Sequence, residues 1–276
     1  MDKKKTILFL IRIVLLLIII VCLAQIGQTY YLSVRHRQQQ ETMSTVVNTT
    51  KPQNLKPQTT PPQESFLQEY KENDNNNENE NDTPEMMERF QALYAENNDL
   101  VGWLSIPDTT IENPVMQCED DEYYLHHNFY REYDPYGCFF VKSIADVNTP
   151  CTNFIIYGHH MKDGSMFGNL DLYQAQEYYQ AHSFISFDTL YEERTYQVMA
   201  VFLSQVYMEQ EDVFKYYQFY QADTEEAFLD FYKAVKELSL YDTGVTAVFG
   251  DTFITLSTCA YHVEDGRFVV VAKRVS

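Results

Sequence analysis

The feature that most constrains this 276-residue chain is an apolar run close to its start. Residues 7–24 (ILFLIRIVLLLIIIVCLA) contain a single charge, at Arg12. As a helix, this run is roughly 27 Å long, close to the thickness of the hydrocarbon core of a bilayer. We therefore expect a transmembrane anchor at residues 7–27, preceded by a cytoplasmic tail of residues 1–6.

The charges that flank the apolar run predict its orientation. Three lysines at residues 3–5 precede it and Arg35 and Arg37 follow it, and basic residues favour the cytoplasmic side of a membrane. The excess before the run predicts a single-pass protein of the cell membrane with its main body on the extracellular face. A cleaved signal peptide is the alternative, because Cys22 and Ala24 are small residues at workable positions for cleavage.

The next part of the chain has the composition of a linker. Residues 51–63 (KPQNLKPQTTPPQ) are rich in Pro and Gln, and residues 72–82 (ENDNNNENEND) contain only Asn, Asp and Glu. Such segments have too few apolar residues to offset the entropy lost on ordering. We expect a flexible extracellular stalk at residues 28–84. Residues 85–276 then form one folded domain, because this length suits a single hydrophobic core.

The charge of the chain excludes one class of partner. The formal net charge is −20, and because residues 1–40 carry +5, the rest of the chain carries −25. Phosphate backbones are bound by clustered Lys and Arg, so this acidic body is not expected to bind nucleic acid.

The folded part is predicted to be mainly β. Seven short apolar or alternating runs predict strands, at residues 103–106, 138–141, 153–157, 197–206, 246–249, 252–258 and 268–275. Two helices are expected beside them. One starts at Thr83 and Pro84, and the other starts with a capping box of Asp223 and Glu226 and has an apolar face that reaches Leu238. Many short strands with few helices indicate a barrel or a sandwich.

The cysteines do not predict a metal site or a disulfide framework. No CxxC spacing occurs among the five, which are Cys22, Cys118, Cys138, Cys151 and Cys259. We therefore expect neither a metal nor a cofactor. A free cysteine is most often a small buried side chain, so only its local context can suggest a role in catalysis.

Cys259 has such a context. Period-2 alternation places Ile254 and Leu256 on one face of a strand, and Thr255, Ser257 and Cys259 on the other. Cys259 is thus expected at the end of a strand on a polar face, which is a poor place for an inert thiol.

Arg267 and His159 are the expected partners of this thiol. Seven residues separate Cys259 from Arg267, and a hairpin between the two strands would make them neighbours. A guanidinium there favours the thiolate and can stabilise an oxyanion. His159 follows the predicted strand 153–157 at a strand end, where catalytic groups often lie, and it can serve as the acid and base that a thiol nucleophile requires.

These residues resemble a known family. Thr255 to Cys259 (TLSTC) resembles the TLxTC signature of sortases, and Arg267 stands where sortases carry their active-site arginine. Other stretches resemble class B sortases in particular: residues 153–167 (NFIIYGHHMKDGSMF) around the histidine, residues 93–106 and 113–117, and a helix-containing insertion at about 208–245.

The resemblance implies a fold and a reaction. The fold is a closed eight-stranded β-barrel with added helices, and the role is to attach secreted proteins to the peptidoglycan of a Gram-positive bacterium. Cys259 would attack the Thr carbonyl of an NPxT-like sorting motif and form a thioester. His159 would protonate the leaving amine, Arg267 would steady the oxyanion, and an amine of a cell-wall precursor would release the product.

The resemblance also implies a substrate groove. Its wall is expected to include Met116, Tyr157 and Ser257. One position departs from the family, because some class B members have an acidic residue directly after the cysteine and this chain has Ala260.

Two alternatives remain from the sequence. A papain-like cell-wall peptidase has its cysteine before its histidine and at the start of a helix, whereas here His159 precedes Cys259 and the cysteine ends a strand. A membrane-tethered binding module without catalysis is the other alternative. Selective reaction of Cys259 with a thiol probe would distinguish an enzyme from such a module.

Overall fold

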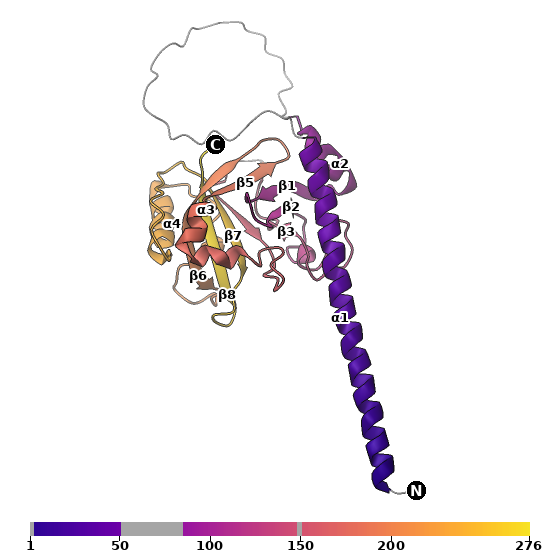
Figure 1. Ribbon diagram of the computed structural model, residues 1–276. Coiled ribbons are helices and arrows are strands. Elements are labelled where there is room, and N and C mark those ends of the chain that lie inside the picture. The colour runs from indigo at the N-terminus through magenta and orange to yellow at the C-terminus, as the bar shows by residue number, and fades with distance from the viewer. Residues whose placement is uncertain (1–2, 51–84, 148–150) are drawn as a thin grey trace, which may run out of the picture.

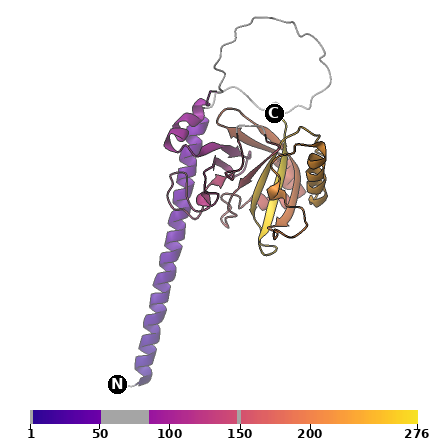
Figure 2. The same ribbon diagram turned by 180° about the vertical axis from the view of Figure 1, so that it is seen from behind.

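The computed structural model describes residues 3–50, 85–147 and 151–276. In these residues eight strands form a closed barrel with the order β1-β2-β3-β4-β7-β8-β6-β5 (Figures 1 and 2). The strands are β1 Leu100–Ser105, β2 Glu112–Met116, β3 Phe139–Phe140, β4 Asn153–Tyr157, β5 Phe184–Thr189, β6 Thr195–Gln205, β7 Phe253–Cys259 and β8 Gly266–Arg274. The predicted closed eight-stranded barrel is confirmed.

Helices lie outside the barrel, and the longest extends far beyond it (Figure 1). The α-helices are α1 Lys3–Thr49, α2 Glu88–Glu96, α3 Gln176–Ala181 and α4 Glu225–Leu238. Three short 3₁₀ helices are η1 Tyr123–Leu125, η2 Leu170–Gln174 and η3 Tyr216–Gln218.

Strand pairing brings distant parts of the chain together. β7 pairs with β8 antiparallel as a hairpin, as expected for a short connection. β7 also pairs with β4, parallel and in register over five residues from Asn153 and Phe253 onward. Parallel strands need a crossover, and here the chain between them contains β5, β6 and α4.

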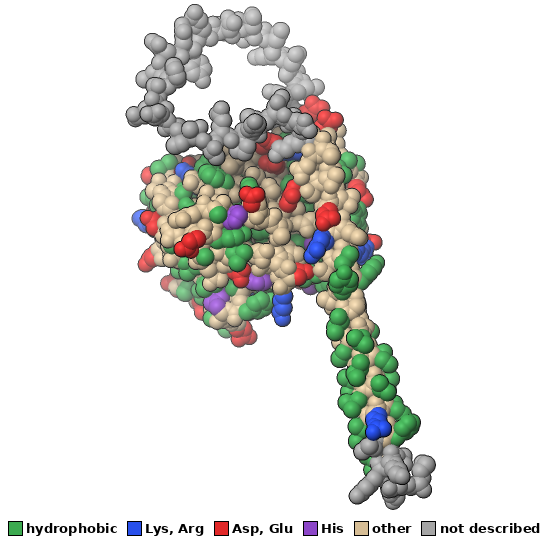
Figure 3. Space-filling model, viewed as in Figure 1, with side chains coloured by type: hydrophobic (Ala, Val, Ile, Leu, Met, Phe, Trp, Pro, Cys, Tyr) green, Lys and Arg blue, Asp and Glu red, His purple; other side chains and the backbone are tan. Residues whose placement is uncertain are grey.

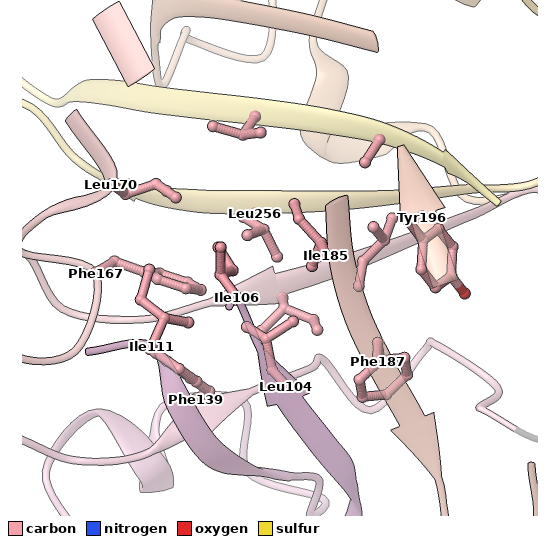
Figure 4. Packing of buried hydrophobic residues seen from close by; sticks show 14 of the residues in the cluster. Leu104, Ile106, Ile111, Phe139, Phe167, Leu170, Ile185, Phe187, Tyr196 and Leu256 are labelled. Atoms are coloured by element: carbon pink, nitrogen blue, oxygen red, sulfur yellow. The ribbon is translucent and has the colours of Figure 1, made fainter. Parts of the chain in front are cut away.

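The interior of the barrel is filled by apolar side chains from several strands (Figure 4). Leu104, Ile185, Phe187 and Leu256 are all fully buried there. Removing an apolar side chain of this size from water contributes about 1.5–3 kcal/mol. Because this core holds the strands in place, it also positions the residues at their ends, such as those that follow β4.

The outer face of β7 is buried as well. Phe253 packs in a second apolar cluster with Phe228, Phe231 and Val235 of α4. The insertion between β6 and β7 therefore covers this side of the barrel, and β7 lies between two apolar layers.

Several predictions of local structure were wrong in detail. The N-cap of α4 is Thr224, whose hydroxyl accepts from the Ala227 amide (3.2 Å), and not Asp223. Residues 246–249 form no strand. Val248 in this apolar run is largely exposed, and the run does not pair with the sheet. β2 and β5 were not predicted. Thr83 and Pro84 lie outside the described residues, and α2 begins at Glu88.

The structure also differs from the prediction of a flexible segment that begins at residue 28. α1 continues without interruption to Thr49. Met43 and Val47 are buried on its final turns in a cluster with Phe90 and Leu93 of α2. Tertiary packing of one apolar stripe, rather than composition, makes this segment helical.

Candidate active site

Strands β4 and β7 end side by side at one end of the barrel. Just past β4, the Gly158 amide donates to the Ser257 carbonyl (3.3 Å), and the Thr258 hydroxyl donates to the Gly158 carbonyl (2.8 Å). His159 is the next residue after Gly158, and Cys259 is the next after Thr258. The parallel pairing thus brings the two predicted catalytic residues to the same end of adjacent strands.

Gly158 allows the chain to leave β4 at this place. A Cβ atom on Gly158 would lie 2.6 Å from the ring of Phe139 and 2.8 Å from the ring of Phe167, which stack on each other. Any larger residue would have to displace one of these buried rings or the backbone next to His159.

Cys259 and Arg267 are cross-strand neighbours. They form the last register pair of the β7–β8 hairpin, as the sequence predicted. The Cys259 side chain is partly exposed. The Arg267 guanidinium is held by its own strand end, because Nη1 donates to the carbonyls of Asp265 (3.1 Å) and Gly266 (2.9 Å). Cys259 and Arg267 thus lie opposite each other across the hairpin, with the guanidinium anchored at the start of β8.

The His159 ring is oriented by a backbone carbonyl. Its Nε2 lies 2.7 Å from the carbonyl oxygen of Leu125 in η1. A carbonyl oxygen only accepts, so Nε2 carries the proton in this bond and Nδ1 of the neutral ring remains free to accept one. The ring is thus held in the tautomer of a base at Nδ1.

His160 has a contact that the sequence analysis did not anticipate. Its Nδ1 lies 3.1 Å from the carbonyl oxygen of Cys259 itself, and its Nε2 lies 4.0 Å from Oδ2 of Asp171. The second histidine of the pair therefore contacts the backbone at Cys259. No sequence signal could identify this contact, because it joins two residues 99 positions apart.

The three predicted groove residues lie in different environments. Tyr157 is partly exposed, and its ring stacks on Phe140 with 5.6 Å between the centroids. Met116 is 0% exposed, because it lies in the apolar cluster that includes residues of α1 and α2. Ser257 is 1% exposed. In this structure, Tyr157 can line a groove, whereas Met116 and Ser257 are too buried to contact a peptide.

Ser257 is buried because the β6–β7 insertion lies over it. Its hydroxyl lies 2.7 Å from the hydroxyl of Tyr216 in η3. Burial raises the pKa of Tyr216 to about 12. Tyr216, which the sequence analysis did not single out, thus closes the polar face of β7 just before Cys259.

The other thiols of the folded part lie in environments that disfavour the thiolate. Burial raises the pKa of Cys138 and Cys151. Burial, together with nearby carboxylates such as Asp99, also raises the pKa of Cys118. Only the thiolate is strongly nucleophilic, so these three thiols should react slowly.

We therefore expect a thiol reagent to label Cys259 first. With iodoacetamide at pH 7.5, Cys259 should react faster than Cys118, another partly exposed thiol of the folded part, because burial and nearby carboxylates disfavour the thiolate of Cys118. Peptide mapping by mass spectrometry over time measures both rates in the same sample. Faster labelling of Cys118 would contradict this assignment.

The described residues contain no group of three or more His, Cys, Asp or Glu that could hold a metal ion. The candidate functional groups at this end of the barrel are the Cys259 thiol, the His159 imidazole and the Arg267 guanidinium. Together they can perform acyl transfer through a thioester.

A comparison with protein families identifies the same fold and reaction. Residues 104–275 match the model of the sortase domain. The chain belongs to the sortase family. Sortases are cysteine transpeptidases, and this sortase therefore is one.

Curated relatives place this sortase in class B. It is 36% identical over 199 residues to sortase B of Listeria monocytogenes, covering 70% of this chain and 76% of the relative. It is 32% identical over 187 residues to sortase B of Staphylococcus aureus, covering 67% and 74%.

Solved structures agree with this placement. Sortase B of Bacillus anthracis matches with a TM-score of 0.62 and 35% identity over 69% of this chain and 86% of the other. A complex of Staphylococcus aureus sortase B with substrate matches with a TM-score of 0.62 and 29% identity, over 69% and 86%. These class B matches fit the helix-containing insertion between β6 and β7.

Proposed function

We propose that this sortase joins secreted proteins to a cell-wall amine, with Cys259 as nucleophile, His159 as acid and base, and Arg267 as the oxyanion donor. The observation that carries the proposal is the meeting of three strand ends. Cys259 is in register with Arg267, and the parallel β4–β7 pair brings His159 to the same end.

The first half of the reaction is acylation. The Cys259 thiol gives its proton to Nδ1 of His159 as its sulfur attacks the Thr carbonyl of an NPxT-like motif. A C–S bond forms, and the carbonyl oxygen becomes an oxyanion that Arg267 stabilises. The amide bond after Thr then breaks, and protonated His159 gives its proton to the leaving amine. The product is a thioester between Cys259 and the secreted protein.

The second half is transfer. An amine of a peptidoglycan precursor or cross-bridge attacks the thioester carbonyl, and His159 accepts a proton from it. The C–S bond breaks, a new amide forms and Cys259 returns to its starting state. No redox step or cofactor is needed in this sequence.

The location proposed for the enzyme is the outer face of the cell membrane. α1 is long and apolar enough to cross a membrane, and the lysines before its apolar part favour a single pass with the barrel outside.

A substrate complex of a class B relative supports a peptide substrate for this chain too.

A panel of sorting peptides tests the substrate assignment. Incubated with an NPxT-like peptide and no amine, the enzyme should gain the mass of the acyl fragment on Cys259, and an added amine should remove it. An LPxT-like peptide should give little adduct. Preferential acylation by LPxT would overturn the proposed motif.

Replacement of Arg267 by Lys tests the role of the guanidinium. A planar guanidinium can hold two acceptors at once, which an ammonium cannot reproduce. We therefore expect Arg267→Lys to lower kcat/KM for the NPxT-like peptide about 100-fold or more, the range for losing an oxyanion donor. Arg274→Lys at the opposite end of β8 is the matched control and should keep normal turnover. Normal turnover of Arg267→Lys would leave Arg267 as a positive charge only.

A further inference from the structure

The described side chains of α1 are exposed up to Tyr31 and begin to contact the folded domain after it. Every side chain described from Ile7 to Tyr31 is exposed, and most of those up to Ile26 are apolar. Figure 3 shows this bare apolar half of the helix beyond the folded domain. Tyr30 and Tyr31 end the exposed part, and tyrosine is enriched where membrane meets water. From Leu32 onward the helix contacts the domain.

The contact nearest the apolar half joins α1 to the loop that carries His159. The Ser33 hydroxyl donates to Oδ2 of Asp163 (3.3 Å), four residues after His159. The Tyr136 hydroxyl donates to the same carboxylate (2.8 Å), and the His36 ring stacks on Tyr136 with 4.5 Å between centroids. These contacts hold the loop after β4 that contains His159 and Asp163, called here the histidine loop, against the helix.

The later turns of α1 are docked more deeply. Gln40 donates to the carbonyls of Thr110 and Glu112 at the start of β2 (both 3.2 Å). Met43 and Val47 are buried in the cluster that also contains Trp103 and Phe90. Hydrogen bonds and apolar burial over residues 32–49 make this segment a part of the domain rather than a loose tether.

The helix therefore fixes the height of the domain above a bilayer. Ser33 lies seven positions after Ile26, a rise of about 10 Å along the helix. The polar headgroup layer is about 5–8 Å thick on each side of the hydrocarbon core. Asp163 and the histidine loop would thus lie at the outer edge of the headgroups, if the apolar half of α1 spans the membrane.

The loop between β7 and β8 lies at the same end of the barrel. Figures 1 and 2 both show this loop directed toward the end of α1 that carries the N-terminus. Tyr261 in this loop is 76% exposed and Val263 is 45% exposed. The Tyr261 ring lies 5.6 Å from the ring of His160. An exposed aromatic and an exposed apolar side chain thus flank the catalytic end.

We propose that docked α1 holds the Cys259 end of the barrel against the headgroup layer of the bilayer that α1 spans, with Tyr261 and Val263 in contact with it. The proposal rests on the proposed role of α1 as a membrane anchor. Because Glu264 and Asp265 lie in the same loop, the contact is with zwitterionic headgroups and not with anionic ones. Substrates held at the bilayer surface then reach Cys259 without a rotation of the domain.

Energy transfer from tryptophan to the membrane surface tests this orientation. The full chain is placed in phosphatidylcholine vesicles that contain a small fraction of lipid with a dansyl headgroup. Tyr261→Trp reports on the catalytic end, and Tyr191→Trp reports on the far end, which is separated from it by β6, roughly 33 Å long. Trp103 stays in every variant, and its signal is subtracted. Transfer should be strong for Tyr261→Trp and weak for Tyr191→Trp.

An insertion in the helix supplies the matched control. Seven alanines after Gly27 add about 10 Å and return the helix to within about 20° of its original phase. They lie outside the docked residues, so the domain keeps its fold while transfer from Tyr261→Trp should fall clearly. Unchanged transfer would overturn the proposal.

Flotation of the vesicles separates two failures. Protein that does not float with the vesicles would overturn the anchor and this inference together. Protein that floats but shows equal transfer from both ends would overturn the orientation alone and leave the proposed anchor and reaction untouched.

Discussion

Replacement of Cys259 by Ala is expected to abolish transpeptidation, with a loss of turnover on the order of 10⁴-fold or more. Removing the nucleophile of a covalent mechanism removes the entire acyl-enzyme route, and neither His159 nor Arg267 can replace the sulfur. Turnover of an NPxT-like peptide and the mass of the acyl-enzyme measure the effect independently.

The fold of the Cys259→Ala protein should be unchanged. The side chain is partly exposed at the end of β7, so its loss should change the free energy of unfolding by no more than about 1 kcal/mol. Cys118→Ala is the matched control, because Cys118 is also partly exposed, and it should remain fully active. Measurable acyl transfer by folded Cys259→Ala would contradict the assignment of Cys259 as the nucleophile.

Replacement of His159 by Ala is expected to lower kcat on the order of 10³-fold. General acid–base catalysis contributes about 10²–10⁴-fold, and His159 is proposed to act in both halves of the reaction. The ring is held by the Leu125 carbonyl with Nδ1 free to accept a proton, which suits this proposed role. Steady-state kinetics of the amine-dependent reaction measure the loss.

His160→Ala is the control for this variant. It removes the bond from His160 to the Cys259 carbonyl, which is worth about 1 kcal/mol and corresponds to a loss of no more than about 10-fold. The protein should therefore remain largely active. A greater loss from His160→Ala than from His159→Ala would show that the two adjacent roles are exchanged.

Local sequence predicted the hairpin that pairs the thiol with its arginine. Alternation up to Cys259, seven connecting residues and an apolar strand after Arg267 are short-range signals, and a hairpin needs no distant partner to set its register. Strand β4 at residues 153–157 was also predicted with correct bounds, because its apolar run is itself a local signal.

The groove residues show what alternation cannot reveal. It correctly placed Ser257 on the face opposite Leu256, and the family resemblance implied that Ser257 and Met116 line a groove. In the structure Tyr216 of the β6–β7 insertion covers Ser257, and the cluster below α1 and α2 covers Met116. Side-chain periodicity identifies the two faces of a strand but not which segment packs on each face.

The sequence by itself determined the apolar helix, the strand that presents Cys259, the hairpin to Arg267 and, through its motifs, the family. Only the tertiary structure decided that β4 lies parallel to β7, which brings His159 to Cys259 across 100 residues of chain, and that α1 docks on the histidine loop. Short-range patterns fix local conformation because the interacting residues are close in sequence. Long-range pairing and docking depend instead on how all buried surfaces fit together, and no single segment carries that information.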